Sequence, residues 1–400
     1  MTMTRGIWLL GVAMTPFGRY PERDDVDLAY EAASGALADA GLEMKQVDVL
    51  AAGSTMNRTG LGQEVQKQLG QYGIPVYNVT NACATGATAL RTVYMALAAG
   101  EAEVGVAIGA EQMGKAGLLG TRTRRSETYT PQGRSGAVVP TEGVLGTNLM
   151  PALFSHAAMD YVRRYPHTDE KVFAEIAEKN HANSVHNPYA MYQKAYSLEE
   201  ILASPTVTSP NTVLMCGPTC DGAAAAVVVT DDFLRKLGPA ARARAIRIAA
   251  SVLTSDPWAE GSEAAPDLNT LSALAAQRAY ERAGVGPNDL DLVELHDCFA
   301  TAELLHYENL QLCGRGEAAD FFASGATRKD GKIPVNPSGG LVSKGHPLGA
   351  TGLANIFEVT THLRGEAGGR QIDGARRGLT HVVGLGSSCA VHILERFDTR

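Results

Sequence analysis

Cys83 lies where an expected strand runs into an expected helix, a position that can make a cysteine reactive. Residues 74–79 are strand-like and largely apolar, and a run of small residues that favours a helix begins near residues 84–86. A thiol at a helix N-terminus faces free backbone N–H groups and the positive end of the helix dipole, which favour thiolate over thiol. The position predicts a lowered pKa for Cys83 and a nucleophile at neutral pH. A small buried core cysteine is the alternative interpretation.

Three more segments carry potentially reactive groups directly after an expected strand. His296, Asp297 and Cys298 follow a strand at 292–295, and His346 lies in a Gly-rich stretch, 336–352, that enters a helix through Gly-Ala-Thr as the Cys83 segment does. The strand at 380–383 ends in residues 384–388, whose glycines let backbone N–H groups approach a ligand closely. Ligands gather at such strand ends. Two thiols, imidazoles and exposed amides together suit acyl transfer, whereas each histidine taken alone is more often structural.

The chain contains an internal repeat. Residues 37–42 and the apolar run 47–50 recur in register as 280–285 and 290–293. Each copy reads as an amphipathic helix closed by glycine, a polar turn and a buried strand, and expected strands at 7–14 and 245–252 precede the two copies. Strand–helix–strand order with short connections predicts parallel pairing in layered sheets. We therefore expect a duplicated α/β architecture, in which the twofold repeat brings a histidine beside Cys83.

The repeat also predicts the domain organisation. Residues 1–112 and 211–240 form the expected N-terminal half, and residues 241–400 form the C-terminal half. Residues 113–210 interrupt the N-terminal half. They have no counterpart in the second half, and they include a helical pattern at 172–179. Such an insertion is typical of a loop domain that covers a site and recognises substrate. The first half should resume with a buried strand ending at 227–229.

Composition and charge limit the classes of partner. The chain has 400 residues, of which 45% are hydrophobic, and a net charge of -8, which argues against nucleic-acid and membrane-surface partners. A local cluster of Arg122, Arg124 and Arg125 is equally compatible with a phosphate contact and with a solvated loop. The apolar run at 7–14 is too short to span a membrane and lacks the features of a signal peptide.

Cysteine spacing predicts neither disulfides nor a metal site. The six cysteines are scattered through a long chain without an export signal, so we expect reduced thiols. Cys216 and Cys220 have a C-x3-C spacing, but no second Cys or His pair lies near them in sequence.

Together these motifs resemble the thiolase family, and specifically its sterol-carrier-protein type. The matching segments are 81–86, 296–299, and 336–340 running through 345–352, with further similarity at 179–181, 187–189, 221–226 and 363–368. The resemblance spans nearly the whole chain. It implies a five-layered αβαβα core with a loop domain over the site, in homodimers or dimer-based tetramers.

The resemblance also implies roles for individual residues. Cys83 is the nucleophile that carries the acyl group as a thioester, and His346 is its base. Gly384 stands where many thiolases have a catalytic cysteine, so Cys298 is expected to serve as the second acid/base. His346 with His296 would form one oxyanion site, and the backbone N–H groups of Cys83 and Gly386 the other. The last loop departs from the family pattern at Ser387 and Ser388, where family members tend to have glycine. Cys389, the next residue, is expected to be a core residue.

The expected activity is transfer of an acyl group between a 3-ketoacyl-CoA and CoA, in either direction, with coenzyme A and acetyl-CoA as substrates and no permanently bound cofactor. One alternative is a thiolase-fold lyase that cleaves a 3-hydroxyacyl-CoA by a retro-aldol reaction with a small partner protein, and that needs no cysteine nucleophile. The other is a non-catalytic acyl-CoA-binding subunit, for which degraded motifs are expected. The C-terminal residues lack a Ser-Lys-Leu type signal, which favours a cytoplasmic location.

Overall fold

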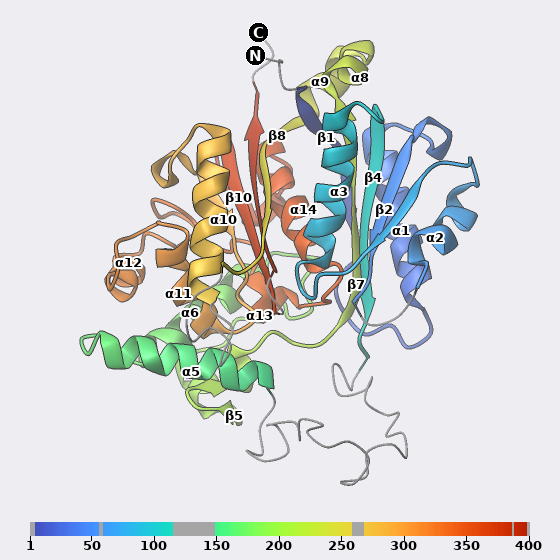
Figure 1. The fold of residues 1–400 in the computed structure, drawn as a ribbon. Helices are drawn as coiled ribbons and strands as arrows, with labels where there is room; N and C mark the ends of the chain where they lie inside the picture. Colours follow the sequence, from blue (N-terminus) through green and yellow to red (C-terminus); the bar gives the residue numbers. More distant parts are fainter. Residues whose placement is uncertain (1–4, 56–58, 115–148, 258–267, 386–387, 398–400) are drawn as a thin grey trace.

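The computed structural model describes residues 5–55, 59–114, 149–257, 268–385 and 388–397 (Figure 1). Nine strands form one sheet in the order β3-β2-β4-β7-β1-β8-β11-β10-β9. The first five belong to the N-terminal half and the last four to the C-terminal half. In the described part of the chain, no helix combines the length and the apolar character needed to cross a membrane.

The N-terminal half is a mixed sheet covered by helices. Strands β3, β2 and β4 are parallel, whereas β7 is antiparallel to both β4 and β1. Its elements are β1 (Ile7–Met14), α1 (Asp25–Ala40), η1 (Met44–Gln46), β2 (Val49–Gly53), α2 (Leu61–Leu69), β3 (Val76–Val79), α3 (Thr85–Ala99), β4 (Val104–Gln112), β7 (Asp221–Thr230), α8 (Asp231–Lys236) and α9 (Pro239–Arg244).

The C-terminal half repeats this plan. β9 is parallel to β10, and β11 is antiparallel to both β10 and β8. The elements are β8 (Ile246–Thr254), α10 (Leu268–Ala283), η4 (Pro287–Asp289), β9 (Leu292–Glu294), α11 (Ala300–Asn309), α12 (Ala318–Ala323), α13 (Gly340–Lys344), α14 (Thr351–Arg364), η5 (Gly368–Arg370), β10 (Arg377–Gly384) and β11 (Ser388–Arg396).

The duplication predicted from the sequence is confirmed at its signature positions. Gly41 ends α1 with φ 67°, and Gly284 follows α10 with φ 68°, the left-handed conformation that glycine adopts most easily. The expectation of parallel pairing is correct only in part. The strands joined by crossover helices are parallel. In contrast, β7 runs antiparallel to both of its neighbours, β4 and β1, and β11 runs antiparallel to both of its neighbours, β10 and β8.

The two halves meet through a strand pair and a central helix layer. Trp8 and Leu9 of β1 pair antiparallel with Arg247 and Ile246 of β8. Helices α3 and α14 pack side by side between the two half-sheets, while α1 and α2 cover one outer face and α10 and α11 the other (Figure 1). This is the expected five-layered order.

Two equivalent glycines permit the close approach of α3 and α14. A Cβ atom on Gly86 would lie 2.6 Å from the carbonyl oxygen of Gly349, and one on Gly352 would lie 2.4 Å from the backbone nitrogen of Ala87. Neither position can take a side chain without backbone movement. Gly86 and Gly352 therefore allow the two halves to pack closely.

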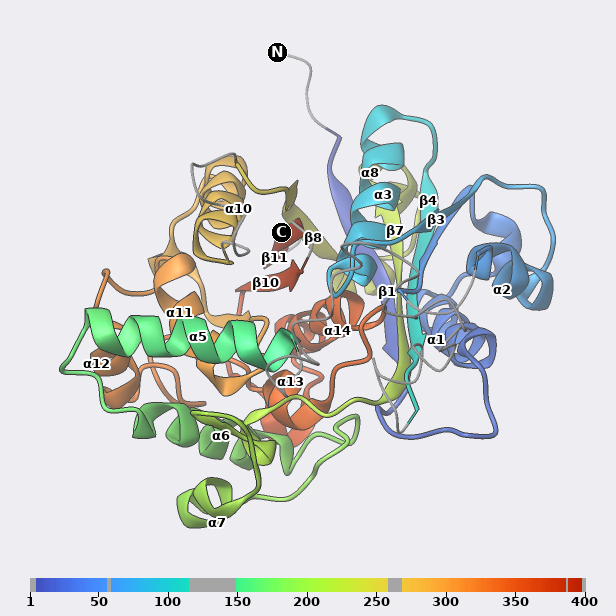
Figure 2. The same cartoon turned by 60° about the horizontal axis from the view of Figure 1, so that its bottom comes forward.

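The segment inserted between β4 and β7 of the N-terminal half packs against the C-terminal half. It contains α5 (Leu149–Arg164), α6 (Lys171–Ser184), α7 (Leu198–Ala203), β5 (Thr206–Thr208), β6 (Asn211–Thr212) and η3 (Val213–Met215). Helix α6 contacts α11 and α13, and α5 contacts α11 (Figure 2). The helix expected at 172–179 is thus present within α6. The cluster of Arg122, Arg124 and Arg125 lies outside the described residues, and the limits 113 and 210 of a loop domain stay a prediction.

Candidate active site

A strained turn places Cys83 between β3 and α3. Ala82 has φ 47°, a conformation that is rare for any residue with a side chain. The Thr85 hydroxyl donates a hydrogen bond to the Ala82 carbonyl oxygen (2.6 Å) and accepts one from the Asn81 backbone N–H (2.8 Å). The first residue of α3 therefore fixes the turn that precedes it. Cys83 as a whole residue is partly exposed, whereas its thiol is removed from water.

His346 is held in a defined tautomer by Thr351 at the start of α14. The Thr351 hydroxyl donates to the Pro347 carbonyl oxygen (3.0 Å) and lies 2.8 Å from Nδ1 of His346. The Thr351 hydroxyl has one proton, which it donates to Pro347. We therefore assign the proton of the Thr351–His346 hydrogen bond to Nδ1 of His346. Nε2 is then a lone-pair acceptor. It is buried and has no hydrogen-bond partner among the described residues.

His296 and His346 converge on Cys83. The Cys83 Sγ atom and one ring nitrogen from each histidine all lie within 4.8 Å of one another. The two imidazole rings are 5.1 Å apart and inclined by 67°. Both ring nitrogens of His296 are buried without a partner in the described structure, which is unusual for polar atoms inside a protein. Unsatisfied nitrogens that face a thiol are suited to bind a polar substrate atom.

Burial reverses the expected ionisation of Cys83. The pKa of its thiol is raised to about 12, chiefly by removal from water and further by the negative charge of Glu111. The prediction of a lowered pKa is therefore wrong for the ligand-free structure, because desolvation outweighs the hydrogen bond from the backbone N–H group, which lowers the pKa. Burial also lowers the pKa of His346 to about 3 and that of His296 well below its usual value. The resting site contains a neutral thiol beside two neutral imidazoles.

Cys298 lies in the same region, after the end of β9. It is 7% exposed, and its carbonyl oxygen accepts a hydrogen bond from the Gly217 backbone N–H (2.8 Å). Burial raises the pKa of its thiol well above the usual value, with a smaller contribution from Cys83, so the two sulfur atoms interact electrostatically. A thiol that stays protonated can act as a proton donor.

Glu111 at the end of β4 is a site residue that sequence reasoning missed. Its carboxylate is fully buried and accepts hydrogen bonds from the Ser54 hydroxyl (3.1 Å), the Thr55 backbone N–H (2.9 Å) and the Gly349 backbone N–H (3.0 Å). It thereby joins the loop after β2 to the loop that carries His346. Glutamate inside an otherwise apolar strand, residues 104–112, was the available signal.

A buried ionic network supports the segment that contains His296 and Cys298, and it too was missed. Lys179 on α6 pairs with Glu303 on α11 (2.7 Å). Asn180 donates to both Glu303 (2.7 Å) and Asp297 (2.9 Å), and the other Asp297 oxygen accepts from the Leu341 backbone N–H (2.7 Å). Asp297 therefore anchors the backbone between the two predicted catalytic residues. The polar pair Lys179-Asn180 within a helical pattern was the sequence signal.

The last loop packs against the nucleophile turn. A Cβ atom on Gly384 would lie 2.2 Å from the Asn81 carbonyl oxygen, and the Ser388 hydroxyl donates to that same oxygen (3.2 Å). A cysteine at position 384 therefore does not fit without backbone movement. The predicted oxyanion donor Gly386 and its neighbour Ser387 lie outside the described residues. Cys389 is fully buried in the hydrophobic core, as expected.

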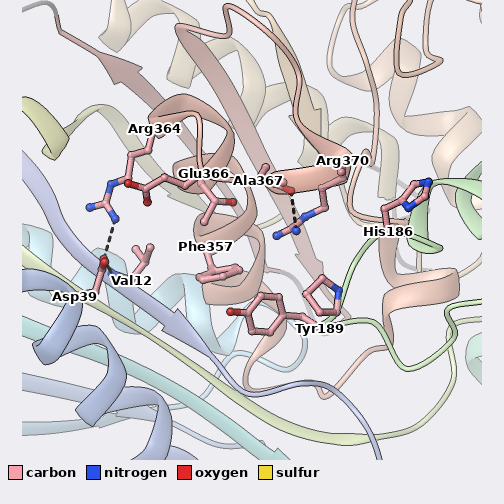
Figure 3. Close-up of a pocket in the computed structure, with 13 residues that line it drawn as sticks. Val12, Asp39, His186, Tyr189, Phe357, Arg364, Glu366, Ala367 and Arg370 are labelled. Atoms are coloured by element: carbon pink, nitrogen blue, oxygen red, sulfur yellow. Dashed lines mark hydrogen bonds and ion pairs between the residues drawn. The ribbon is translucent and has the colours of Figure 1, made fainter.

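A separate cavity of about 560 Å³ lies beyond the far end of α14 (Figure 3). Tyr189 and Phe357 contribute its aromatic wall, and Arg364 reaches Asp39 through an ion pair of 2.8 Å. The four predicted catalytic side chains do not line it. The cavity therefore belongs to the junction between α1, α14 and the segment after α6, not to the cluster around Cys83.

Comparison with protein families gives matches to both halves. Residues 7–201 match the model of the thiolase N-terminal domain, and residues 258–396 match a model described as thiolase C-terminal domain-like. Sterol carrier protein 2 of Homo sapiens is 41% identical over 394 residues, which cover 97% of this chain and 71% of the human protein. The acetyl-CoA acetyltransferase of Methanothermobacter thermautotrophicus is 35% identical over 403 residues, covering 98% of this chain and all of the archaeal protein.

Solved structures agree on the fold. Human mitochondrial 3-ketoacyl-CoA thiolase in complex with CoA superposes with a TM-score of 0.73 over the full length of both chains, at 18% identity. A structure titled "Ltp2-ChsH2(DUF35) aldolase" superposes with a TM-score of 0.80 over 98% of both chains, at 24% identity. These two similarities bear on fold alone, whereas the family models and the relatives above 30% identity bear on descent. The chain belongs to the thiolase family.

Proposed function

We propose that this protein is a thiolase that transfers an acyl group between a 3-ketoacyl-CoA and CoA through a thioester on Cys83. The observation that carries the proposal is the convergence of the Cys83 Sγ atom with ring nitrogens of His296 and His346, all within 4.8 Å. A nucleophilic sulfur, a base with a free lone pair and a further buried polar group are what acyl transfer requires. The acetyl-CoA acetyltransferase relative supports the same reaction class.

The first step is attack of Cys83 on the 3-keto carbon. Since the pKa of the free thiol is about 12, proton transfer to Nε2 of His346 accompanies the attack and does not precede it. The new C–S bond leaves negative charge on the former keto oxygen, which the backbone N–H groups of Cys83 and Gly386 stabilise in this proposal. Loss of one such donor costs about 3–4 kcal/mol of transition-state stabilisation.

The second step breaks the bond between C2 and C3. The electron pair passes to acetyl-CoA as an enolate, whose oxygen is held by His296 and His346, and the S–H group of Cys298 protonates its carbon. The raised pKa of Cys298 keeps that proton in place until the enolate forms. The thiol of CoA then attacks the thioester and gives its proton to the Cys298 thiolate, while Cys83 leaves as the C–S bond breaks and recovers its proton from His346. Claisen condensation is the same sequence in reverse.

A second candidate is retro-aldol cleavage of a 3-hydroxyacyl-CoA with a small partner protein. The similarity to the structure titled as an aldolase favours it, although that similarity concerns the fold alone. This reaction needs no thioester. The converging Cys83, His296 and His346 therefore favour the thiolase, because a lyase has no use for the nucleophile.

Covalent labelling separates these two candidates. We expect intact-protein mass spectrometry to detect an acyl adduct after incubation of the native protein with an acyl-CoA, and no adduct on a Cys83→Ala variant. Cys313→Ala is the matched control, because Cys313 is also a partly exposed free thiol. An undiminished adduct on Cys83→Ala would show that another residue carries the acyl group.

Proton exchange tests the role of Cys298. A Cys298→Ala variant should still be acylated at Cys83, but it should lose the exchange of the acetyl-CoA methyl protons with solvent deuterium, measured by NMR. Exchange at the native rate would assign the acid/base role to another residue.

We further propose a homodimer formed along β3. This strand is an outer edge of the sheet; Tyr77 within it is 48% exposed, and Tyr72, which precedes it, is 54% exposed. An open edge with exposed aromatic residues is a surface that proteins usually cover. Light scattering measures the mass of the native protein, expected to be a dimer, and of a Tyr77→Lys variant, in which the dimer should be weakened. A native monomer would contradict the proposal.

The cytoplasmic location stays a prediction.

A further inference from the structure

We propose that Cys83, His296 and His346 also form a binding site for Zn²⁺ or a similarly soft divalent cation, and that its occupation inhibits the enzyme. The metal site stands on the cluster geometry alone. The inhibition rests on the proposed function. The sequence predicts no metal site, since these residues lie far apart along the chain; the fold brings together a Cys and two His side chains, which is a ligand set typical of zinc.

The spacing of the ligand atoms is close to what zinc requires. Zn–S bonds of about 2.3 Å and Zn–N bonds of about 2.0–2.1 Å place tetrahedral ligand atoms roughly 3.3–3.6 Å apart. The three atoms in this site already lie within 4.8 Å of one another. The imidazole rings are inclined by 67° and are not stacked, so two nitrogens can point toward one centre. Small rotations of the three side chains complete the geometry, and solvent takes the fourth position.

The lone pairs that a metal needs are available. Nε2 of His346 and both nitrogens of His296 have no hydrogen-bond partner among the described residues. Thr351 fixes the other nitrogen of His346, as outer-shell partners of zinc-bound histidines do. His296 has no such outer partner within the described part of the chain, so we expect reversible binding that is weaker than in a structural zinc site.

Metal binding and acyl transfer compete for the same atoms. When Zn²⁺ binds, the Cys83 S–H bond breaks, the sulfur binds the metal as thiolate, and one proton passes to the buffer. The metal also occupies Nε2 of His346, the proposed proton acceptor. Conversely, the sulfur of an acylated Cys83 is no longer a thiolate ligand. Acylation should therefore protect the enzyme from zinc, and zinc should prevent acylation.

The ligand types predict selectivity between cations. Mg²⁺ and Ca²⁺ prefer oxygen ligands, and the three converging groups supply sulfur and nitrogen only. We expect Zn²⁺ and Co²⁺ to bind, and Mg²⁺ to leave the enzyme unaffected.

Cobalt substitution tests the site without reference to activity. Titration of the native, chelator-treated protein with Co²⁺ should produce a thiolate-to-cobalt charge-transfer band and tetrahedral visible bands that saturate at one equivalent. Zn²⁺ should abolish them. The bands should disappear in Cys83→Ser and after methylthiolation of the native protein, a block that requires no mutation. They should persist in Cys313→Ser. Thr351→Val should weaken binding by about 10- to 100-fold.

Each outcome decides one part of the proposal. Absence of the bands, or their survival in both Cys83-blocked samples, overturns the metal site. Saturating bands with undiminished acyl transfer in the presence of Zn²⁺ overturn the inhibition. If the bands appear as expected but the protein lacks acyl-transfer activity altogether, the metal site stands and the proposed thiolase function fails. Reversal of inhibition by EDTA is expected.

Discussion

The two halves share one plan but hold their proposed catalytic groups in different ways. In the N-terminal half, the strand ends around Cys83 are lined mainly by small residues, and a buried carboxylate, that of Glu111, joins the loops. In the C-terminal half, buried charges near the corresponding strand ends form ion pairs: Lys344 pairs with Glu294 within this half, and Glu303 pairs with Lys179 of the inserted segment. The proposed nucleophile, Cys83, thus lies on a tightly packed backbone turn, while His296 and Cys298 lie on a segment held by a framework of buried charges.

The difference follows from what each group has to do. A nucleophile attached by a short side chain is positioned once its backbone is positioned, and close packing around Ala82 and Gly86 does this. Acid/base residues must keep both their orientation and their protonation state. Buried ion pairs and hydrogen bonds can fix orientation where packing alone leaves rotation open.

The largest expected effect comes from breaking the charged framework. Lys179→Met leaves the Glu303 carboxylate buried without its cation, which should destabilise the protein by about 3–5 kcal/mol. The matched control is Lys236→Met, because Lys236 pairs with Glu103 at 2.7 Å on the exposed surface, where a pair contributes about 0–1 kcal/mol. Denaturant unfolding measures both. Equal losses would mean that the framework does not stabilise the C-terminal half.

An intermediate effect is expected from the packing between the halves. Gly86→Ala and Gly352→Ala each place a methyl group within 2.6 Å of backbone atoms of the other half, so each should cost about 1–3 kcal/mol. Gly18→Ala is the control, since its added Cβ would have its nearest neighbour at 3.4 Å. Thermal unfolding checks the three variants. A native melting temperature for both helix variants would show that α3 and α14 separate easily.

The smallest effect sharpens the account of Cys83. Because the pKa of its thiol is raised, thiol predominates below that pKa, and alkylation by iodoacetamide should accelerate about tenfold per unit between about pH 7 and 9. Glu111→Gln removes the negative charge, so it should lower the pKa and speed alkylation at a given pH. Ser54→Ala removes one hydrogen bond to Glu111 but keeps the charge, and serves as control. A plateau below pH 9 in the native protein contradicts the raised pKa.

Local patterns were enough to predict much of this fold. Glycine caps after two similar helices identified the duplication, and the duplication in turn predicted that His346 would lie near Cys83. These features depend on neighbours in sequence and on a twofold relation visible in the sequence itself.

Other properties depend on residues that no local pattern connects. The ionisation of Cys83 follows from burial and from Glu111, which comes from another strand, so the helix dipole considered alone predicted the wrong sign. The Lys179–Glu303 pair joins the inserted segment to α11. The direction of β7 and β11 also escaped prediction, because strand order along the chain does not fix which way a returning strand runs.

The pairing of β1 with β8 has a consequence for how substrates enter. A continuous hydrogen-bonded sheet runs through both halves, and the Arg364–Asp39 ion pair bridges them as well. The two halves are therefore expected not to separate when a ligand binds. Under the proposed function, an acyl chain is expected to enter at the strand ends, where fixed side chains limit its length.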